Sequence, residues 1–263
     1  MSLTVIKIGG HALDASKNAE LLLDSMAQDL AQLHAEGQQV VLVHGGGPQI
    51  NEILSLTGVV SSFVNGLRVT DAATLRAVVM GLSHVNAKLC AALGARGLRV
   101  VGCNGTTDRL IQASVNEDSL GFVGGNIKAN VDFLRAQLEL GLIPIVAPFG
   151  GDTTGQLLNC NADAAAGAIA GALSADALVL LSDIDQVRTD PSDASTGVAR
   201  MNVAEAQALI ATGAAKEGMV PKIDSALVAL SHGASKVVIA NGSRPHAIRD
   251  VLNQTTLQTE VVA

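Results

Sequence analysis

Two glycine-rich turns, each directly after a hydrophobic run, are the first places in this 263-residue sequence where chemistry could occur. Lys7 precedes Gly9 and Gly10, and His44 precedes the three glycines at 45–47. Glycine lets the backbone come close to a ligand, and free N–H groups at a helix start favour an anion. The turns therefore predict anion-binding loops, although glycines can also serve only as tight strand-to-helix connections.

Polar and charged residues gather in later segments. Asn159, Asn161 and Asp163 alternate before an alanine-rich stretch, and Lys222 follows a glycine turn at an expected helix start. One residue would suffice to cap the helix that the alanine-rich stretch forms, so three polar residues exceed the need for a cap. At Lys222, a helix start disfavours a cation. These groups indicate a second charged site, while a simple cap and a solvated surface lysine stay open as alternatives. Arg68 follows another turn, and its guanidinium suits bidentate binding of a carboxylate.

The residue types together favour charge stabilisation over acid–base catalysis. Two lysines, one arginine, one orienting aspartate and several glycine turns match the needs of phosphoryl transfer, in which positioning and charge neutralisation supply most of the catalysis. The sequence contains no GxxxxGK[ST], GxGxxG, GxSxG or HExxH motif, and its six histidines show no metal-ligand spacing. These patterns predict no protein-held metal.

Composition excludes several classes of protein. A net charge of −7 argues against binding to nucleic acid or to a membrane surface, and four Phe without Tyr or Trp weaken any base-stacking role. With 48% hydrophobic and 16% charged residues the chain is not disordered, and its longest charge-free stretches fall short of a bilayer span of about 20 residues. Three distant cysteines and no secretory pattern predict a reduced, cytoplasmic protein.

The elements that must position these residues follow from hydrophobic patterning. Short β-branched runs alternate with helical patterns, which is typical of an α/β fold with a mostly parallel sheet. We expect strands at Leu3–Ile8, Gln39–Val43, Leu98–Gly102, Ile143–Ala147, Ala177–Ser182 and Lys236–Ala240. We expect helices at Asn18–Glu36, Pro48–Leu56, Asp71–Leu82, Val85–Arg96, Val131–Leu140, Ala162–Leu173, Asn202–Thr212 and Pro221–His232. The turn-rich stretch Gly150–Gly155 is the expected boundary between two lobes, 1–150 and 151–263.

The motifs, taken in order, resemble the amino-acid kinase family over essentially the whole chain, and within it the kinases that act on N-acetyl-L-glutamate. The segments that carry the resemblance are Lys7–Gly10, His44–Ile50, Asn65–Thr70, Asn159–Asp163, Leu181–Asp183 and Gly218–Lys222. The resemblance implies a three-layer αβα sandwich. Its N-terminal lobe would bind N-acetyl-L-glutamate and make a dimer contact, and its C-terminal lobe would bind ATP with Mg²⁺ held mainly by the nucleotide. The implied reaction is phosphorylation of the γ-carboxylate of N-acetyl-L-glutamate, in arginine biosynthesis.

The resemblance also assigns roles to individual residues. Lys7 and Lys222 would stabilise the transferring phosphoryl group from opposite sides, Asp163 would hold both lysines, and the N–H groups of Gly10 and Gly46 would join them. The implied acetylglutamate-binding residues are Gly46, Gly47, Arg68 and Asn159, with Arg68 on the α-carboxylate. The implied nucleotide-binding residues are Lys7, Gly9, Gly10, Asp183, Ile184, Asp185, Gln186, Val187, Arg188, Ala214, Ala215, Lys216, Met219 and Lys222.

The sequence departs from the family pattern at three places and leaves two other functions open. One departure is the stretch Gly102–Asp108, which varies from the commoner Gly-Leu-x-Gly-x-Asp pattern. Related enzymes usually carry glycine where Gln186 stands, and Gly-Thr where Gln258–Glu260 stands. A sister kinase would act on aminoadipate or glutamate attached to a carrier protein, and a non-catalytic sensor would bind an amino acid or a nucleotide. The combination of two lysines with their aspartate favours an enzyme over a sensor.

We also expect a particular assembly. The Ala- and Leu-rich helices and a mean hydropathy of +0.38 predict apolar surface covered by a second subunit in a homodimer. Arginine-inhibited relatives carry an additional N-terminal helix, whereas here the first expected strand begins almost at Met1. We therefore expect a dimer that is insensitive to arginine.

Overall fold

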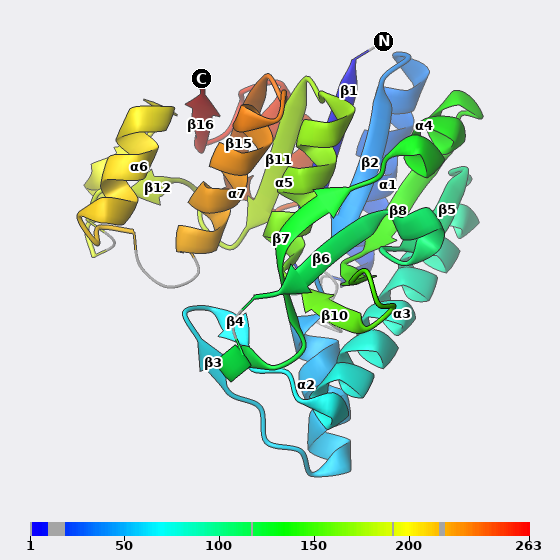
Figure 1. Cartoon of the computed structure of the whole chain (residues 1–263). Helices are drawn as coiled ribbons and strands as arrows, with labels where there is room; N and C mark the ends of the chain where they lie inside the picture. The colour runs from blue at the N-terminus through cyan, green and yellow to red at the C-terminus, as the bar shows by residue number, and fades with distance from the viewer. Residues whose placement is uncertain (1, 10–18, 117, 191, 216–218) are drawn as a thin grey trace.

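The computed structural model describes residues 2–9, 19–116, 118–190, 192–215 and 219–263. Within them, an eight-stranded sheet lies between two layers of helices (Figure 1) in the order β14-β16-β15-β11-β1-β2-β8-β5. Its strands are β1 (Leu3–Ile8), β2 (Gln39–His44), β5 (Val100–Asn104), β8 (Ile143–Ala147), β11 (Ala177–Ser182), β14 (Arg200–Asn202), β15 (Lys236–Asn241) and β16 (Gln258–Val262). All neighbouring strands pair in parallel except β15 and β16. The expected α/β fold around a mostly parallel sheet is confirmed.

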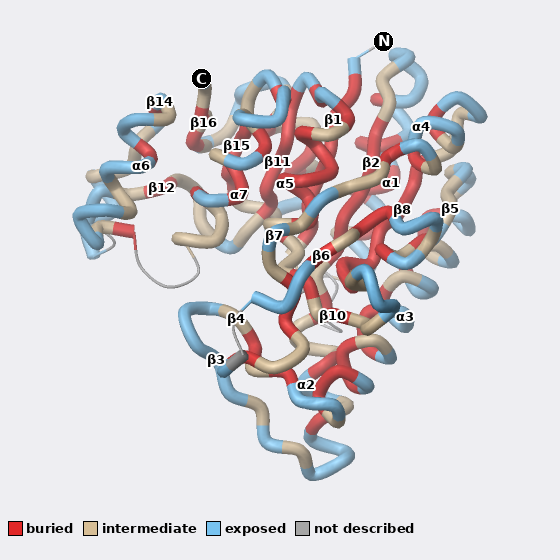
Figure 2. The backbone as a smooth tube through the Cα atoms, in the orientation of Figure 1, coloured by how far each residue is buried: buried red, intermediate tan, exposed pale blue. Residues whose placement is uncertain are grey.

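The strands are buried on both faces, which explains their nearly continuous apolar sequences. In β1, Val5 belongs to the core on one face, whereas Ile6 and Ile8 belong to the core on the other. The first core is shared with α4 (Asp132–Glu139), α5 (Ala162–Leu173), α6 (Val203–Ala211) and α7 (Met219–Ser231). The second core is shared with α1 (Ala19–Ala35), α3 (Ala72–Ala95) and α8 (Ala247–Leu252). Figure 2 shows the buried central strands between more exposed helices.

Smaller elements lie outside the central sheet. They are α2 (Gly47–Thr57), the hairpin of β3 (Phe63–Val64) and β4 (Leu67–Arg68), the pair β12 (Val187–Arg188) and β13 (Gly197–Val198), and a small closed barrel of β6 (Ile111–Val115), β7 (Val123–Ala129), β9 (Phe149–Gly151) and β10 (Leu157–Cys160). The expected lobe boundary, Gly150–Gly155, falls at the end of β9 and in the turn that leads to β10. The central sheet contains strands from both expected lobes, and the division at residue 150 stays a prediction.

The expectation of two helices at Asp71–Leu82 and Val85–Arg96 is wrong, because the structure forms one helix, α3. Gly81 and the polar residues after it interrupt the apolar pattern in the sequence. In the structure an ideal Cβ on Gly81 would lie 3.0 Å from the side chain of Ile50, so this glycine allows close packing of α2 on α3. The buried face then continues through Leu82, Val85 and Leu89 without a proline to break the helix.

α3 is also long and apolar enough to cross a membrane by length and composition, and it is the one such helix in the described part of the chain. Its buried residues Leu89 and Leu93 pack into the second core, and Leu82 packs into a smaller cluster with Ile50 and Leu54 of α2. A core helix of an α/β fold satisfies the same criteria, and this packing places one face of α3 against the protein core.

Candidate active site

Three charged side chains from three different elements meet at one end of the sheet. Lys7 is near the end of β1, Asp163 lies in the first turn of α5, and Lys222 lies in the first turn of α7. Lys7 Nζ is 2.8 Å from Asp163 Oδ1, and Lys222 Nζ is 2.9 Å from Asp163 Oδ2. The three side chains are 9%, 7% and 13% exposed in the order Lys7, Asp163, Lys222. We call them the Lys–Asp–Lys triad.

Local capping explains why Asp163 is available for the two lysines. Asn161 is the N-cap of α5, and its side chain accepts hydrogen bonds from the N–H groups of Asp163 and Ala164 at 2.8 and 3.0 Å. The cap is thus supplied by Asn161, and both oxygens of Asp163 contact lysines. Lys222 is turned inward, so the alternative of a solvated surface lysine is wrong.

The electrostatics of the triad follow from its burial. Burial lowers the pKa of Lys7, the like charge of Lys222 lowers it further, and Asp163 opposes both effects. Burial alone would raise the pKa of Asp163, but the two ammonium groups outweigh it and hold that pKa below its usual range. Asp163 is therefore ionised at neutral pH, as a counter-ion for the two lysines must be.

The four predicted acetylglutamate-binding residues line one pocket beside the triad: Gly46, Gly47, Arg68 and Asn159. The pocket lies among the glycine turn after β2, the β3–β4 hairpin and the start of α5. Asn159 donates a hydrogen bond from Nδ2 to Thr70 Oγ1 at 3.1 Å. An ideal Cβ on Gly46 would lie 2.9 Å from Leu82 Cδ2, so a larger residue would have to displace that packed side chain.

The guanidinium of Arg68 is held by neutral groups. Its two terminal nitrogens donate to Asn51 Oδ1, at 2.8 Å, and to Ser61 Oγ, and its Cζ lies 4.5 Å from the centre of the Phe63 ring. Burial lowers the pKa of Arg68, yet a guanidinium stays protonated in proteins. Among the described residues no carboxylate pairs with it, so the pocket presents an uncompensated cation to a ligand. Sequence reasoning missed Asn51 and Ser61, because nothing in the sequence places them beside Arg68.

The predicted nucleotide residues lie mainly in the loop after β11. Asp185 in that loop accepts hydrogen bonds from Asn241 Nδ2 at 3.1 Å and from Arg244 at 2.6 Å, which joins it to the loop after β15. Ala214 and Ala215 follow α6, and Met219 begins α7. Gly10 and Lys216 lie outside the described residues. Asn241 and Arg244 were missed, although two neighbouring parallel strands end in these loops and strand ends at one sheet edge commonly form ligand sites.

Two of the departures from the family pattern, at Gln186 and at Gln258–Glu260, contact each other. Gln186 Nε2 donates to the backbone carbonyl of Gln258 at 3.0 Å, and Val187 N donates to Thr259 Oγ1 at 2.9 Å. An ideal Cβ on Gly197 would lie 2.5 Å from Gln186 Oε1, so Gly197 leaves room for the glutamine. The loop after β11 is thus fastened to β16 through the positions that differ.

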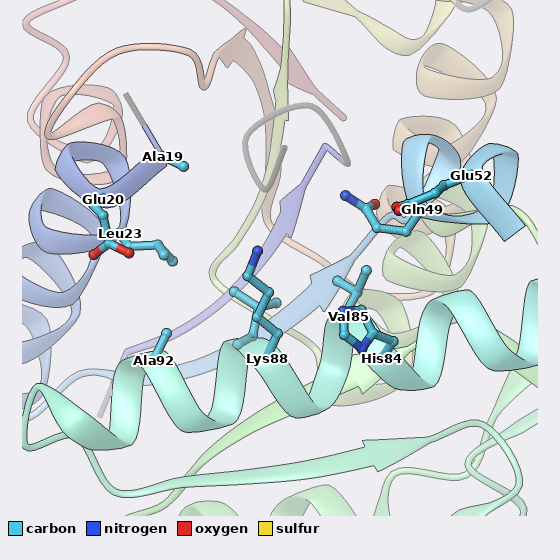
Figure 3. Close-up of a pocket in the computed structure, with 10 residues that line it drawn as sticks. Ala19, Glu20, Leu23, Gln49, Glu52, His84, Val85, Lys88 and Ala92 are labelled. Carbon is cyan, nitrogen blue, oxygen red and sulfur yellow. The ribbon is translucent and has the colours of Figure 1, made fainter. Parts of the chain in front are cut away.

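A second hollow lies between α1, α2 and α3. Figure 3 shows Lys88 and Gln49 directed into it, with Glu20 and Glu52 at its sides. None of the described residues that the sequence predicted for the site lines this hollow. Its mixture of acidic and basic groups indicates no single class of ligand.

His44, which opens the glycine turn, has a buried ring that gives a prediction about stability. Burial lowers its pKa to about 4, from 6.5 in the unfolded chain. Between these values the unfolded chain binds a proton that the folded protein excludes, so stability falls as pH drops from 6.5 to 4. The loss should reach about 3 kcal/mol, measured by denaturant unfolding at several pH values. The same pH dependence in a His44→Asn variant would contradict the assignment to this residue.

Comparisons with known proteins show the family to which the chain belongs. A family model described as the amino acid kinase family matches residues 2–241. The chain therefore belongs to the amino acid kinase family, and it is a kinase. It is similar to the acetylglutamate kinase of Ruegeria sp. (strain TM1040), with 39% identity over 94% of this chain and 84% of the relative. It is also similar to the acetylglutamate kinase of Methanocaldococcus jannaschii, with 39% identity over 93% of this chain and 84% of the relative.

Solved structures show the same fold. An N-acetylglutamate synthase from Neisseria gonorrhoeae, complexed with coenzyme A and N-acetyl-glutamate, matches with a TM-score of 0.83 and 26% identity. The match covers 100% of this chain but only 59% of the synthase chain. Carbamate kinase from Giardia lamblia bound to AMP-PNP matches with a TM-score of 0.72 over 99% of this chain and 98% of that one, at 18% identity. The αβα arrangement implied by the resemblance is thereby confirmed.

Proposed function

We propose that the chain transfers the γ-phosphoryl group of ATP to the γ-carboxylate of N-acetyl-L-glutamate, in arginine biosynthesis. A carboxylate oxygen forms a bond to the γ-phosphorus as the bond from that phosphorus to the β,γ-bridging oxygen breaks. The products are N-acetyl-L-glutamyl 5-phosphate and ADP, and no proton has to be removed from the ionised acceptor. The observation that carries the proposal is the buried Lys–Asp–Lys triad beside a pocket with an uncompensated arginine.

In this reaction Arg68 binds the α-carboxylate, and Gly46, Gly47 and Asn159 orient the acetylated amino acid. Asn51 and Ser61 hold the guanidinium before the substrate arrives, so less conformational entropy is lost on binding. An acceptor carried by an acidic protein fits less well, because the net charge of −7 repels such a partner. The free amino acid derivative is therefore the favoured acceptor.

The triad supplies charge where the transferring group needs it. Lys7 and Lys222 approach that group from opposite sides, Asp163 keeps the two ammonium groups together, and the N–H groups of Gly10 and Gly46 add neutral donors. Both oxygens of Asp163 are engaged by lysines, so this carboxylate is not offered to a metal. Mg²⁺ is held mainly by the nucleotide, and when bound it neutralises phosphate charge. The nucleotide-binding side of the site is formed by Gly9 and by residues 183–188, 214–216 and 219.

A direct test follows acyl-phosphate formation with hydroxylamine and ADP release with a coupled assay. N-acetyl-L-glutamate, glutamate, aminoadipate and carbamate are compared as acceptors. We expect the highest kcat/KM with N-acetyl-L-glutamate. A preference for another acceptor would contradict the proposed substrate, and ligand binding without turnover would favour the sensor alternative.

Replacement of Arg68 by lysine should mainly raise the KM for N-acetyl-L-glutamate. An ammonium group cannot reproduce a bidentate contact, and a charge-assisted hydrogen bond contributes about 1.5–3 kcal/mol, which corresponds to a rise of roughly 10- to 100-fold. The KM for ATP should stay near normal. Arg76→Lys, an exposed arginine on α3, is the matched control. If only the ATP constant changed, Arg68 would belong to the nucleotide side.

We also propose that the enzyme is a homodimer in the cytoplasm. Leu56 on α2 and Met80 on α3 are 81% and 60% exposed, and such apolar side chains are commonly covered by a partner. Cys90, Cys103 and Cys160 are free thiols, which fits a reducing compartment. Light scattering at micromolar concentration should give about twice the chain mass of 26.7 kDa. A monomer mass at that concentration would contradict the dimer.

A further inference from the structure

His44 is the last residue of β2, and its ring has no exposure to solvent. It pairs in register with Ile8 of β1, so by strand alternation it faces the core of α1 and α3, opposite to the face of Lys7. The mechanism proposed above gives this buried histidine no task. It nevertheless directly precedes the glycine turn that lines the substrate pocket.

The hydrogen bonds of His44 define one protonation state. Nδ1 is 2.9 Å from the carbonyl oxygen of Gly45, which can only accept, and Nε2 is 3.1 Å from Asn86 Nδ2. The same Asn86 amide nitrogen lies 2.8 Å from the carbonyl oxygen of Ile145, so it is the donating end of that side chain. His44 is therefore neutral, with its proton on Nδ1 and a lone pair on Nε2 that accepts from Asn86.

The hydrogen bond from His44 to the Gly45 carbonyl also fixes the orientation of the Gly46 N–H. The carbonyl of Gly45 and the N–H of Gly46 belong to the same planar trans peptide unit and point in opposite directions. Glycine on both sides would let this unit rotate easily. With the carbonyl held toward His44, the Gly46 N–H points toward the opposite face, on which Lys7 lies. Among the described residues, no backbone hydrogen bond is donated by this N–H.

We propose that His44, held by Asn86, is a positioning residue that orients the Gly45–Gly46 peptide so that the Gly46 N–H faces the transferring phosphoryl group. The inference rests on the proposed function, which places that group against Gly46. Asn86 also lies 3.3 Å from the carbonyl oxygen of Cys103. The two hydrogens of this amide are thus shared among acceptors on β2, β8 and β5, which fixes the side chain of Asn86 beside the histidine.

No charged group disturbs this arrangement among the residues that the structure describes. The titratable groups in the same hydrogen-bond network are the thiols of Cys90 and Cys103, and burial raises the pKa of each. Protonation of His44 would place an Nε2–H against the Asn86 amide, which is a donor. The neutral ring is thus the form that holds the turn.

Two substitutions test the Nδ1 donor and the Nε2 acceptor of the His44 ring separately. In His44→Asn the amide nitrogen takes the place of Nδ1, so the donor to Gly45 is kept and the acceptor for Asn86 is lost. In His44→Gln the terminal oxygen takes the place of Nε2, so the acceptor is kept and the donor is lost. The Gly46 N–H is still present in the glutamine variant and loses only its fixed orientation, so kcat should fall by less than for full removal of a donor, roughly 10- to 100-fold, with the ATP KM little changed. The fall in kcat should be about tenfold smaller in the asparagine variant than in the glutamine variant.

Controls separate positioning from simple destabilisation. His232→Asn and His232→Gln, at an exposed histidine, should leave kcat unchanged. Melting temperatures are measured for all variants. A ring that only fills the core predicts kcat losses that follow the loss of stability in both His44 variants. That result, or normal kcat in His44→Gln, would overturn the proposal.

A measurement on the unmodified protein does not depend on whether a variant folds. Long-range ¹⁵N–¹H spectra should show His44 with its proton on Nδ1 throughout pH 6–8, and the opposite tautomer or an imidazolium would overturn the proposal. The backbone amide signal of Gly46 should shift on addition of Mg-ADP, aluminium fluoride and N-acetyl-L-glutamate, and an unchanged signal would count against it. Lys7→Ala tests the proposed function separately, because full activity there would contradict the phosphoryl site without changing the His44 tautomer.

Discussion

Replacement of either Lys7 or Lys222 by alanine should lower turnover by roughly two to three orders of magnitude, the typical loss for one preorganised donor to developing charge. Each ammonium group is held within 3 Å of an oxygen of Asp163, so little reorganisation is needed when the phosphoryl group transfers. The remaining lysine still pairs with Asp163, which should preserve the fold. The measurement is kcat at saturating ATP and N-acetyl-L-glutamate, with circular dichroism as the check on folding.

The matched control for the lysine variants is Lys128→Ala, at an exposed lysine on β7. It should retain normal turnover. Near-normal turnover in Lys7→Ala or Lys222→Ala would remove that lysine from the mechanism.

Replacement of Asp163 by asparagine should lower turnover by about two orders of magnitude or more, at almost constant side-chain volume. The two ammonium groups would then repel each other without a counter-ion. Burial already lowers the pKa of Lys7, and that pKa should fall further, so Lys7 would become neutral at a lower pH. The alkaline limb of the pH–rate profile should therefore move to lower pH than in the unmodified enzyme.

Substrate binding separates this outcome from a structural one. Because Asn161 supplies the cap of α5, the Asp163→Asn variant should bind N-acetyl-L-glutamate almost normally by calorimetry. A large fall in melting temperature with turnover retained would mean that Asp163 acts only in folding.

The sequence predicted most of the central sheet, because buried parallel strands have continuous apolar runs. β1, β8 and β11 begin and end where the pattern places them. The small barrel was not predicted, because its strands are short and contain glycines that resemble turn residues. Gly124 on β7 illustrates the reason: an ideal Cβ there would lie 2.8 Å from Cys160 Sγ. This glycine permits close packing between strands, and a single sequence cannot distinguish that from a turn.

The sequence predicted which residues belong to the candidate site, but it did not predict which of them contact each other. Lys7, Asp163 and Lys222 stand out in the sequence because glycine turns or a helix start surround them, but they are brought together only by the parallel sheet and its helices. Asn51 and Ser61, which hold Arg68, carry no local signal. His44 and Asn86 likewise belong to different elements, so their hydrogen bond depends on how α3 crosses the strand ends.

The most direct test of the central claim is the affinity for a mimic of the transferring group, Mg-ADP with aluminium fluoride, in the presence of N-acetyl-L-glutamate. If the Lys–Asp–Lys triad stabilises the transition state, Lys222→Ala should weaken binding of this mimic by the same factor by which it lowers kcat/KM, while binding of a non-hydrolysable ATP analogue changes little. Equal affinity of Lys222→Ala and the unmodified enzyme for the mimic would contradict the account.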